Sequence, residues 1–363
     1  MKLLLVINSM ILAGAEVFFA ELAPLLKQAG IDVSVLLLRR LDGALEKILA
    51  EQGIPVLYTP QDRIYAASQI WHLRKRFREF DIVHTQLFPT QLWSVLGRSG
   101  RQPVLLTTEQ NTDNNRRKPW LRPMDRFMYS RYDHICSNSE ATRTRLEQWL
   151  PELQVEMSVI PNGISLKRVA HAKPLSRRTV VGDDDRLPIL LSAARLQPQK
   201  DHATLLRAIA MLGQPVHLLL AGDGELKPEL ERLAADLGIR ERVHFLGRRD
   251  DVPSLLRTAD IFVHSTHSDG FCVAALEAMA AGLPLVASRV PGLAEVIGNA
   301  GLLVPPQDPK AFAAAVSLLL AQPERRHELA QAARQRSQLF SIEASAKAYI
   351  DLYRGLLPRT ANA

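Results

Sequence analysis

Two cations stand close together in the segment Arg195-Leu196-Gln197-Pro198-Gln199-Lys200, which follows an apolar run at Ile189–Ala193. Arginine offers a planar fork of N–H donors to phosphate oxygens, and lysine offers a compact positive charge. If the apolar run is a strand of a parallel sheet, both side chains lie beyond its carboxyl end, where the ligands of such sheets bind. We therefore interpret Arg195 and Lys200 as candidates for binding a phosphorylated ligand.

Two carboxylates follow another candidate strand, which ends at His264. An apolar helix that begins near Cys272 would place Asp269 at its entrance and Glu277 within it. A carboxylate among small apolar residues is costly to bury unless a polar partner faces it. Asp269 alone would be explained as a helix cap, but the two carboxylates together favour a site for a polar ligand.

The first apolar run, Leu3–Ile7, is followed by a loop of small residues that leads into a helix near Gly14. Backbone N–H groups at the start of a helix approach an anion closely when no side chain intervenes. A glycine at such a place is also common for structural reasons, so both interpretations stay open. One glycine alone does not make the three-glycine fingerprint of dinucleotide-binding folds.

Short apolar segments alternate with amphipathic ones along the chain, and the alternation restarts after a turn signal at Pro161-Asn162-Gly163. The candidate strands are short runs rich in Val, Ile and Leu, at Leu3–Ile7, Val33–Leu38, Val56–Tyr58, Ile82–His84, Val104–Thr107, His134–Ser137, Ile189–Ala193, Val216–Ala221, Val243–Phe245, Ile261–His264, Leu285–Ala287 and Leu302–Val304. Such strands between amphipathic helices are typical of parallel sheets covered on both faces. The predicted fold class is α/β, with two Rossmann-like, doubly wound domains that face each other across a cleft.

The predicted domains are an N-terminal one over residues 1–165 and a C-terminal one over 188–340, joined by a linker over 166–187 where apolar periodicity is lost. The chain beyond Pro309 looks helical with a break near Gln322-Pro323, and residues 341–363 are expected to pack back toward the N-terminal domain. A length of 363 residues fits two ordinary domains. Apolar runs are far shorter than the about 20 residues of a membrane-spanning helix. The two distant cysteines form neither a disulfide nor a metal pattern and indicate a reducing cytoplasm.

The formal net charge of +7 originates in residues 63–131, which hold 13 basic and 5 acidic residues. These cations are interleaved with aromatic residues such as Trp71, Trp93, Trp120 and Phe127. Nucleic acid, an anionic membrane surface or a phosphorylated ligand would each fit this composition. An ordinary solvated face with long basic side chains fits it as well. No recognisable RNA-binding module accompanies the segment.

Several short motifs of the second half follow one another in order: Arg195-x4-Lys200, Gly222-Asp223-Gly224-Glu225, Val243-x-Phe245-Leu246-Gly247, Asp269-x7-Glu277-Ala278-Met279-Ala280-x-Gly282-x-Pro284 and Gly301-Leu302-Leu303-Val304. Ala13-Gly14-Ala15-Glu16 and Val159-Ile160-Pro161-Asn162-Gly163 precede them in the first half. The pattern resembles the retaining, nucleotide-sugar-dependent glycosyltransferases of the GT-B fold, the group called family 4 or group 1. The resemblance spans nearly the whole chain.

This resemblance implies a role for each matching residue. Arg195 and Lys200 would hold the diphosphate of the donor, and Asp269 would contact hydroxyls of the transferred sugar. The residues implied in donor binding, through phosphate, base or ribose, are Gly14, Gly247, Arg248, Phe271, Cys272, Val273 and Glu277. No metal ion is expected, because two cations and a helix N-terminus can neutralise the charge of the departing nucleoside diphosphate.

Two positions depart from the family pattern. Asp269 is one methylene shorter than the family's first glutamate, which changes its reach to the sugar. Gln110 follows a strand where many relatives have a histidine. The acceptor-side candidates are therefore Glu109, Gln110 and His84, which ends a neighbouring strand, although a lone histidine is often a structural residue.

We expect a hexosyltransferase that moves a sugar from a UDP- or GDP-sugar, without a further cofactor, to a glycan or polyprenyl-linked acceptor. The reaction would serve bacterial lipopolysaccharide, exopolysaccharide or another cell-surface glycoconjugate. The basic segment 63–131 would attach the protein to the inner face of the cytoplasmic membrane, and nucleic acid is not an expected partner. Two alternatives stay open: a nucleotide-sugar epimerase of the same fold and a non-catalytic protein that binds nucleotide sugars.

Overall fold

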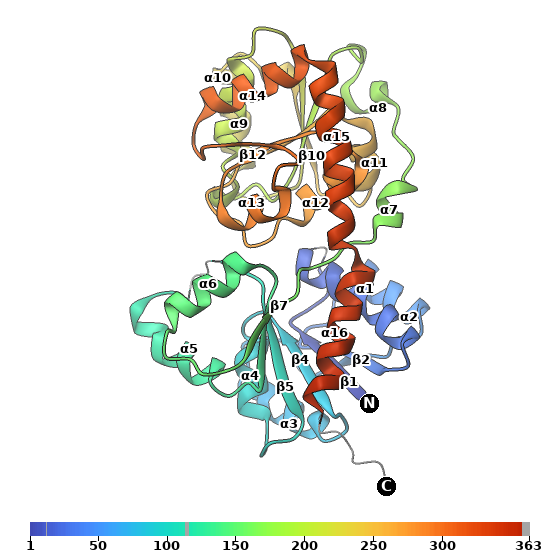
Figure 1. The fold of residues 1–363 in the computed structure, drawn as a ribbon, viewed down its shortest axis with the longest axis vertical. Helices are drawn as coiled ribbons and strands as arrows, with labels where there is room; N and C mark the ends of the chain where they lie inside the picture. The colour runs from blue at the N-terminus through green and yellow to red at the C-terminus, as the bar shows by residue number, and fades with distance from the viewer. Residues whose placement is uncertain (12, 113–115, 358–363) are drawn as a thin grey trace. The chain divides into compact units, whose positions relative to one another are not determined.

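The computed structural model describes residues 1–11, 13–112 and 116–357. They form two compact units, each built around its own sheet (Figure 1). Unit 1 consists of Met1–Ile164 and the C-terminal segment from Ser341, and unit 2 consists of Ser165–Phe340. The strands within each sheet are parallel, so both units have the Rossmann-like α/β architecture that the alternating sequence pattern predicts.

Unit 1 contains a sheet of seven strands in the order β3-β2-β1-β4-β5-β6-β7. The strands are β1 (Lys2–Ile7), β2 (Asp32–Leu37), β3 (Val56–Tyr58), β4 (Ile82–Gln86), β5 (Val104–Glu109), β6 (His134–Ser137) and β7 (Met157–Val159). The chain winds outward in one direction from β1 and in the other from β4. Ligands of such sheets bind at the carboxyl ends of the strands near this reversal.

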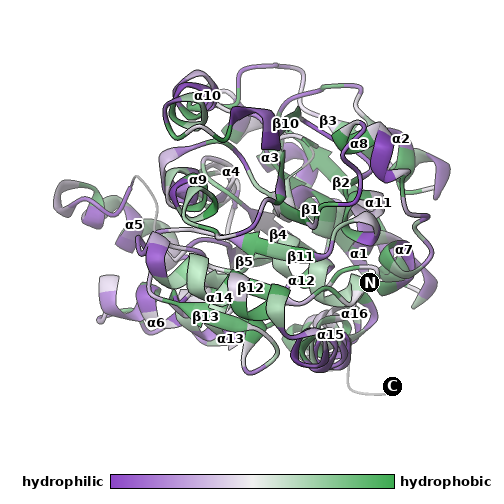
Figure 2. Ribbon diagram, turned by 90° about the horizontal axis from the view of Figure 1, so that it is seen from above, coloured by the Kyte–Doolittle hydropathy of each residue, from purple (hydrophilic) through white to green (hydrophobic). Residues whose placement is uncertain are grey.

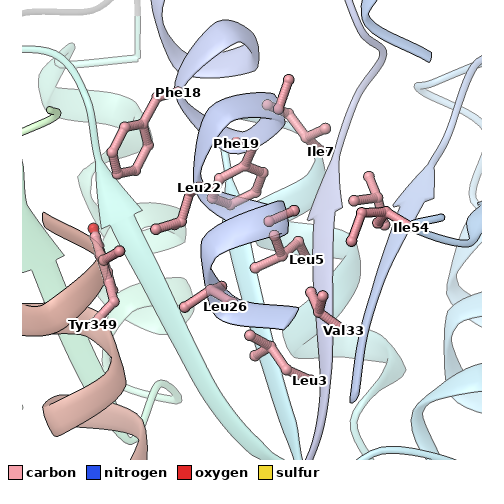
Figure 3. Close-up of a cluster of buried hydrophobic side chains, with 14 of the residues drawn as sticks. Leu3, Leu5, Ile7, Phe18, Phe19, Leu22, Leu26, Val33, Ile54 and Tyr349 are labelled. Carbon is pink, nitrogen blue, oxygen red and sulfur yellow. The ribbon is translucent and has the colours of Figure 1, made fainter. Parts of the chain in front are cut away.

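Strand β1 shows why the apolar runs of unit 1 form central strands. Leu3, Leu5 and Ile7 join one hydrophobic core, whereas Leu4 and Val6 join a second core on the opposite face of the sheet. Helices of the first face are α1 (Gly14–Gln28), α2 (Ala44–Glu51) and α16 (Ile342–Leu356), and helices of the second are α3 (Gln69–Phe77), α4 (Thr90–Gly97), α5 (Arg122–Tyr129) and α6 (Glu140–Trp149). Figure 3 shows α1 side chains of the first core lying over β1.

The C-terminal helix α16 is an integral part of unit 1. Tyr349 and Tyr353 are fully buried in the same core as α1, and Figure 3 shows Tyr349 beside Phe18 of that helix. The backbone N–H of Ile342 also donates to Ile164 O at 2.9 Å. The chain therefore returns to the N-terminal sheet through α16, as the sequence predicts.

Unit 2 contains a sheet of six strands in the order β10-β9-β8-β11-β12-β13. These strands are β8 (Ile189–Ala193), β9 (His217–Ala221), β10 (Val243–Gly247), β11 (Ile261–His264), β12 (Leu285–Ser288) and β13 (Leu302–Val304). The helices are α7 (Leu166–Ala170), α8 (Arg177–Val181), α9 (His202–Ala210), α10 (Lys227–Asp236), α11 (Val252–Thr258), α12 (Val273–Ala281), α13 (Pro291–Ile297), α14 (Pro309–Ala321) and α15 (Pro323–Ser337). Hydrophobic residues gather in strands such as β11, whereas α15 is largely hydrophilic (Figure 2).

Residues 166–187 differ from the expected linker, because they contain α7 and α8 and belong to unit 2. Arg177 holds α8 in place by pairing with Asp260 at 3.1 Å and donating to Leu187 O at 2.7 Å. Polar contacts rather than a periodic apolar face hold this segment to unit 2, so the sequence pattern does not indicate its helices. A second break, at Ser341, separates α15 from α16, in addition to the break predicted at residue 322.

Candidate functional site

A buried ion pair lies at the carboxyl edge of the unit 2 sheet. After β8 the chain turns through a short 3-10 helix, Pro198–Lys200, which brings Lys200 Nζ within 2.6 Å of Asp269 Oδ2. The two side chains are 17% and 9% exposed. Burial opposes the charge on Asp269, but the Lys200 ammonium and a hydrogen bond with His264 outweigh it and hold the pKa of the carboxyl well below its usual range. Lys200 and Asp269 are both site residues predicted from the sequence. They lie 69 positions apart in the chain and meet in the fold.

Arg195 is exposed at the end of the same strand, in a loop that packs against its neighbours. The N–H of Gly222, which follows β9, donates to the O of Gly247, the last residue of β10, at 2.8 Å. A Cβ on Gly222 would lie 2.0 Å from Ala194 O, so glycine is required for this approach. Arg248, also exposed, follows directly. The glycine motifs therefore bring three loops together beside Arg195.

Glu277 is buried in the second turn of α12, and its charge is matched by an arginine that sequence reasoning missed. Its Oε1 accepts a hydrogen bond from Arg168 Nη2 of α7 at 2.5 Å. Burial raises the pKa of Glu277 above its usual value despite the Arg168 charge. The two residues are 109 positions apart and Arg168 lies in the expected linker, so no spacing signal connects them. Asp269 and Glu277 each have their own cation.

The predicted residues Phe271, Cys272 and Val273 lie at the start of α12, where Cys272 is the N-cap. The first N–H groups of a helix have no acceptor within the helix and face outward along its axis. Helix α13 packs directly on the loop that precedes α12. A Cβ on Gly292 of α13 would lie 2.3 Å from Gly270 O in that loop, so glycine is needed for this close contact. The helix N-terminus is therefore presented by a well-packed loop.

His84, predicted as an acceptor-side candidate, lies in the interior of unit 1 with 0% exposure. Its Nδ1 lies 2.7 Å from the Tyr353 hydroxyl and its Nε2 lies 2.7 Å from Thr108 Oγ1. Phe19 packs edge-on against the ring. Burial lowers the pKa of His84 to about 3. With both nitrogens bonded and no exposed surface, His84 is placed as a structural residue that anchors α16.

Glu109 and Gln110, the other acceptor-side candidates, take part in different hydrogen-bond networks: Glu109 is the last residue of β5, and Gln110 follows it. Glu109 accepts a hydrogen bond from the Tyr129 hydroxyl on the α5 side of the sheet. Gln110 Oε1 accepts from Asn138 Nδ2 at 3.1 Å and from Asn162 Nδ2 at 2.6 Å. Within the described residues, Gln110 Nε2 and Asn162 Oδ1 are buried without a partner. The nitrogen of the Gln110 amide and the oxygen of the Asn162 amide therefore remain unpaired among the described residues at this edge.

The loop that leads into α1 is described except for Leu12. Helix α1 begins at Gly14, after an extended Ala13 that provides no side-chain cap. Glu16 is buried in the first turn. The start of the helix thus has the small-residue character that the sequence indicated, and the donor-binding role of Gly14 stays a prediction.

Two family profiles cover most of the chain. Glycosyltransferase Family 4 matches residues 12–168, and Glycosyl transferases group 1 matches residues 177–336. The chain belongs to this glycosyltransferase family. The family that the motifs predict is confirmed.

Curated relatives of this glycosyltransferase are similar over most of its length. It is 28% identical over 324 residues to the D-inositol 3-phosphate glycosyltransferase of Corynebacterium urealyticum, which covers 80% of this chain and 75% of that one. It is 28% identical over 356 residues to the lipopolysaccharide core biosynthesis glycosyltransferase LpsE of Rhizobium meliloti, covering 93% and 95%. Anabaena HepE, solved in complex with UDP and glucose, has a TM-score of 0.84 at 21% identity over 98% of this chain and 100% of that one. This likeness confirms the GT-B type of fold.

The basic segment of the glycosyltransferase divides into internal and exposed cations. Arg98 pairs with Asp133 at 2.8 Å with its side chain only 10% exposed, and Arg116 pairs with Asp125 at 3.2 Å. The exposed group, here called the basic aromatic face, consists of two tryptophans and one phenylalanine among cations on and next to α3 and α5: Trp71, Arg74, Lys75, Arg76, Arg78, Lys118, Trp120, Arg122, Arg126, Phe127 and Arg131. Trp71 and Trp120 are 75% and 72% exposed. Among the described residues, no helix is both long and apolar enough to cross a bilayer.

Proposed function

We propose that this glycosyltransferase moves a hexosyl group from a nucleotide-diphosphate sugar to a hydroxyl acceptor, with retention and without a metal ion. The observation that carries the proposal is the group of cations at the carboxyl edge of unit 2, where Arg195 is exposed and Lys200 pairs with Asp269 beside the N-terminus of α12. Breaking the sugar–phosphate bond leaves negative charge on the diphosphate. Cations and helix N–H groups stabilise this charge as it develops.

The ion pair assigns different tasks to the two cations. Asp269, at 2.6 Å, largely neutralises the charge of Lys200. Arg195 would therefore supply the additional positive charge that binds the negative diphosphate. Arginine also binds two phosphate oxygens at once. Asp269, held ionised by its neighbours, would accept hydrogen bonds from hydroxyls of the transferred sugar. Glu277 would accept them from the ribose, with Arg168 fixing its position.

Neutral amides of unit 1 suit a hydroxyl acceptor. Gln110 Nε2 and Asn162 Oδ1 offer one donor and one acceptor that have no partner among the described residues. A hydroxyl group both donates and accepts, so it would satisfy the two amides together. The relatives are named for D-inositol 3-phosphate and for lipopolysaccharide core biosynthesis, and both names support an acceptor rich in hydroxyls. We place the acceptor in cell-surface glycan or glycolipid synthesis.

The basic aromatic face supports attachment to an anionic membrane surface on the cytoplasmic side. Tryptophan favours the membrane–water interface, and each cation near an anionic surface adds attraction. Purified protein should float with vesicles that contain anionic phospholipid at low salt. Equal recovery with neutral vesicles would contradict an electrostatic attachment.

Donor binding is tested by a thermal-shift screen with UDP, GDP and their sugars. UDP is the first choice because HepE was solved with it. A ligand at about 100 times its dissociation constant stabilises the folded chain by about 2.7 kcal/mol. Arg195→Ala should remove this shift without changing the melting temperature of the ligand-free protein. Arg232→Ala, an exposed arginine on α10, is the matched control and should keep it.

Two other functions predict different products. An epimerase of the same fold would convert one nucleotide sugar into another and would not need an acceptor. A binding protein without catalysis would show the nucleotide shift with no product from any acceptor. Following the anomeric configuration of the product by NMR tests retention directly, and full turnover after chelator treatment tests the independence from metal.

A further inference from the structure

Three side chains with metal-ligating atoms converge at the start of α12. His264 ends β11, Asp269 lies in the following loop and Cys272 is the N-cap of the helix. Their ligand atoms all lie within 4.8 Å of one another. His264 Nε2 lies 3.5 Å from Cys272 Sγ and 3.5 Å from Asp269 Oδ2. All three residues are buried.

These separations suit a tetrahedral zinc ion. With zinc bonds of about 2.0–2.3 Å, neighbouring ligand atoms of a tetrahedral site lie about 3.4–3.6 Å apart. Two of the distances already have this value, and the third pair of ligand atoms lies within 4.8 Å. Three protein ligands leave a fourth position open. Thiolate and imidazole prefer zinc to magnesium, which selects oxygen ligands.

The imidazole of His264 directs Nε2 at the two other ligand atoms. Its Nδ1 is buried without a hydrogen-bond partner within the described residues. Burial opposes a charge on the ring, but Cys272 and Asp269 outweigh it and raise the pKa of His264 to about 9, so a metal ion takes the place of the Nε2 proton. The ring stacks on Phe262, with the two planes 7° apart, which holds its orientation.

Lys200 competes with a metal ion for the same carboxylate. Its Nζ lies 2.6 Å from Asp269 Oδ2. A metal ion bound to that carboxylate would lie close to the ammonium group, and two positive charges near each other repel strongly in a buried place. We propose that His264, Asp269 and Cys272 bind Zn²⁺ as an inhibitory ion that displaces Lys200. The thiol proton of Cys272 and the Nε2 proton of His264 leave to solvent as the Zn–S and Zn–N bonds form, and the ammonium group of Lys200 swings outward.

The consequence for catalysis rests on the proposed function. If Lys200 helps to hold the donor diphosphate, zinc and the nucleotide exclude each other. The binding of zinc itself does not depend on any activity. Zinc would then lower the apparent affinity of the enzyme for its donor, whereas Mg²⁺ would not.

Zinc binding is measured on tag-free, chelator-treated full chain by competition with a chromophoric chelator. The expected result is one tight ion per chain, with affinity at least about tenfold lower in Cys272→Ser. Cys136→Ser is the matched control, since Cys136 is the other buried free cysteine. Co²⁺ should give a thiolate charge-transfer band in the wild type and in Cys136→Ser but not in Cys272→Ser. Unchanged zinc affinity in Cys272→Ser, or a Co²⁺ spectrum without that band, overturns the site.

Lys200→Gln makes the competition itself visible. Removal of the ammonium should raise zinc affinity while it weakens the thermal shift by UDP, so the two measurements move in opposite directions. Zinc affinity that is unchanged or lower in Lys200→Gln contradicts the displacement of Lys200. Zinc bound tightly by a protein that shows no nucleotide shift at all would sink the proposed function and leave the metal site standing.

Discussion

The two units share one architecture, but the side chains at the carboxyl edges of their sheets differ in charge. In unit 2 the edge carries two ion pairs, Lys200 with Asp269 and Arg168 with Glu277. In unit 1 the corresponding edge on the α16 side carries amides around Gln110. The parallel sheet determines where loops meet, whereas the residues in those loops determine what is bound. A charged leaving group suits the first edge, and a neutral hydroxyl suits the second.

The largest expected effect comes from removing the exposed cation of the charged edge. Arg195→Ala should lower kcat/KM for the nucleotide sugar by about 10²–10³, the usual loss for one group that stabilises developing charge in a closed site. Steady-state kinetics with varied donor measure it. Arg232→Ala, with the same change in net charge, should leave kcat/KM within about twofold. Equal losses in both variants would show that net charge, and not this edge, determines donor use.

The next effect tests the neutral edge. Gln110→Leu removes the oxygen that accepts from Asn138 and Asn162, and a buried donor left unpaired costs up to about 3 kcal/mol. All four tryptophans lie in unit 1, so denaturant unfolding followed by tryptophan fluorescence reports this loss. Gln110→Glu keeps an acceptor at the same place and should be clearly more stable than Gln110→Leu.

A matching kinetic result would sharpen the contrast between the edges. Gln110→Leu should raise the KM for the acceptor and leave the thermal shift by UDP unchanged. A weaker UDP shift in this variant would contradict the assignment of neutral amides to the acceptor.

The sequence predicts most of the fold because strands such as β1 are apolar on both faces. It misses α6 because that helix, Glu140–Trp149, buries only Thr142 and Leu146 and so has almost no apolar periodicity. It misses α13 because the segment begins with Pro291-Gly292, which is typical of a turn. Elements held by polar or close backbone contacts leave no periodic signal.

The candidate site shows the same limit. Motif order predicts Lys200 and Asp269, and the structure joins them. Arg168, which pairs with Glu277, belongs to no motif. Only the packing of α7 against α12 brings the two residues together. His84 has the residue type of a catalytic base, and only its burial and its two bonded nitrogens reveal a structural role.

Acid stability offers a further test, because each unit buries a histidine that resists protonation. Burial lowers the pKa of His84 in unit 1 and of His202 in unit 2 to about 3. Between pH 6.5 and pH 3 the unfolded chain therefore binds a proton that the folded chain excludes, and the free energy of unfolding falls as the pH falls. At pH 5 the loss is about 2 kcal/mol for each histidine.

Fluorescence-detected unfolding follows unit 1, which holds all four tryptophans. The wild type should lose about 2 kcal/mol between pH 7 and pH 5 through His84, and His84→Gln should lose correspondingly less over the same interval. A variant with the same pH dependence as the wild type would mean that another group controls acid unfolding. His202→Gln, in unit 2, is the matched variant: if the units unfold separately, it leaves the tryptophan-detected transition unchanged, and if they unfold together, it loses correspondingly less stability at pH 5, as His84→Gln does.

The smallest expected effect concerns the basic aromatic face of unit 1. The proposed membrane attachment involves this unit and not unit 2. Removing one exposed cation next to an anionic membrane costs about 1 kcal/mol, which is about a fivefold lower partition coefficient. Lys75→Gln on α3 and Arg131→Gln after α5 should each show this loss with anionic vesicles. Arg232→Gln in unit 2 removes the same charge from the other unit and should change binding much less.

If all three variants lose affinity equally, the attraction depends on the total charge of the protein and the face has no special role. If Trp120→Ala also lowers binding at high salt, where Coulomb attraction is screened, the tryptophan inserts into the interface and the face is an anchor rather than a diffuse charge.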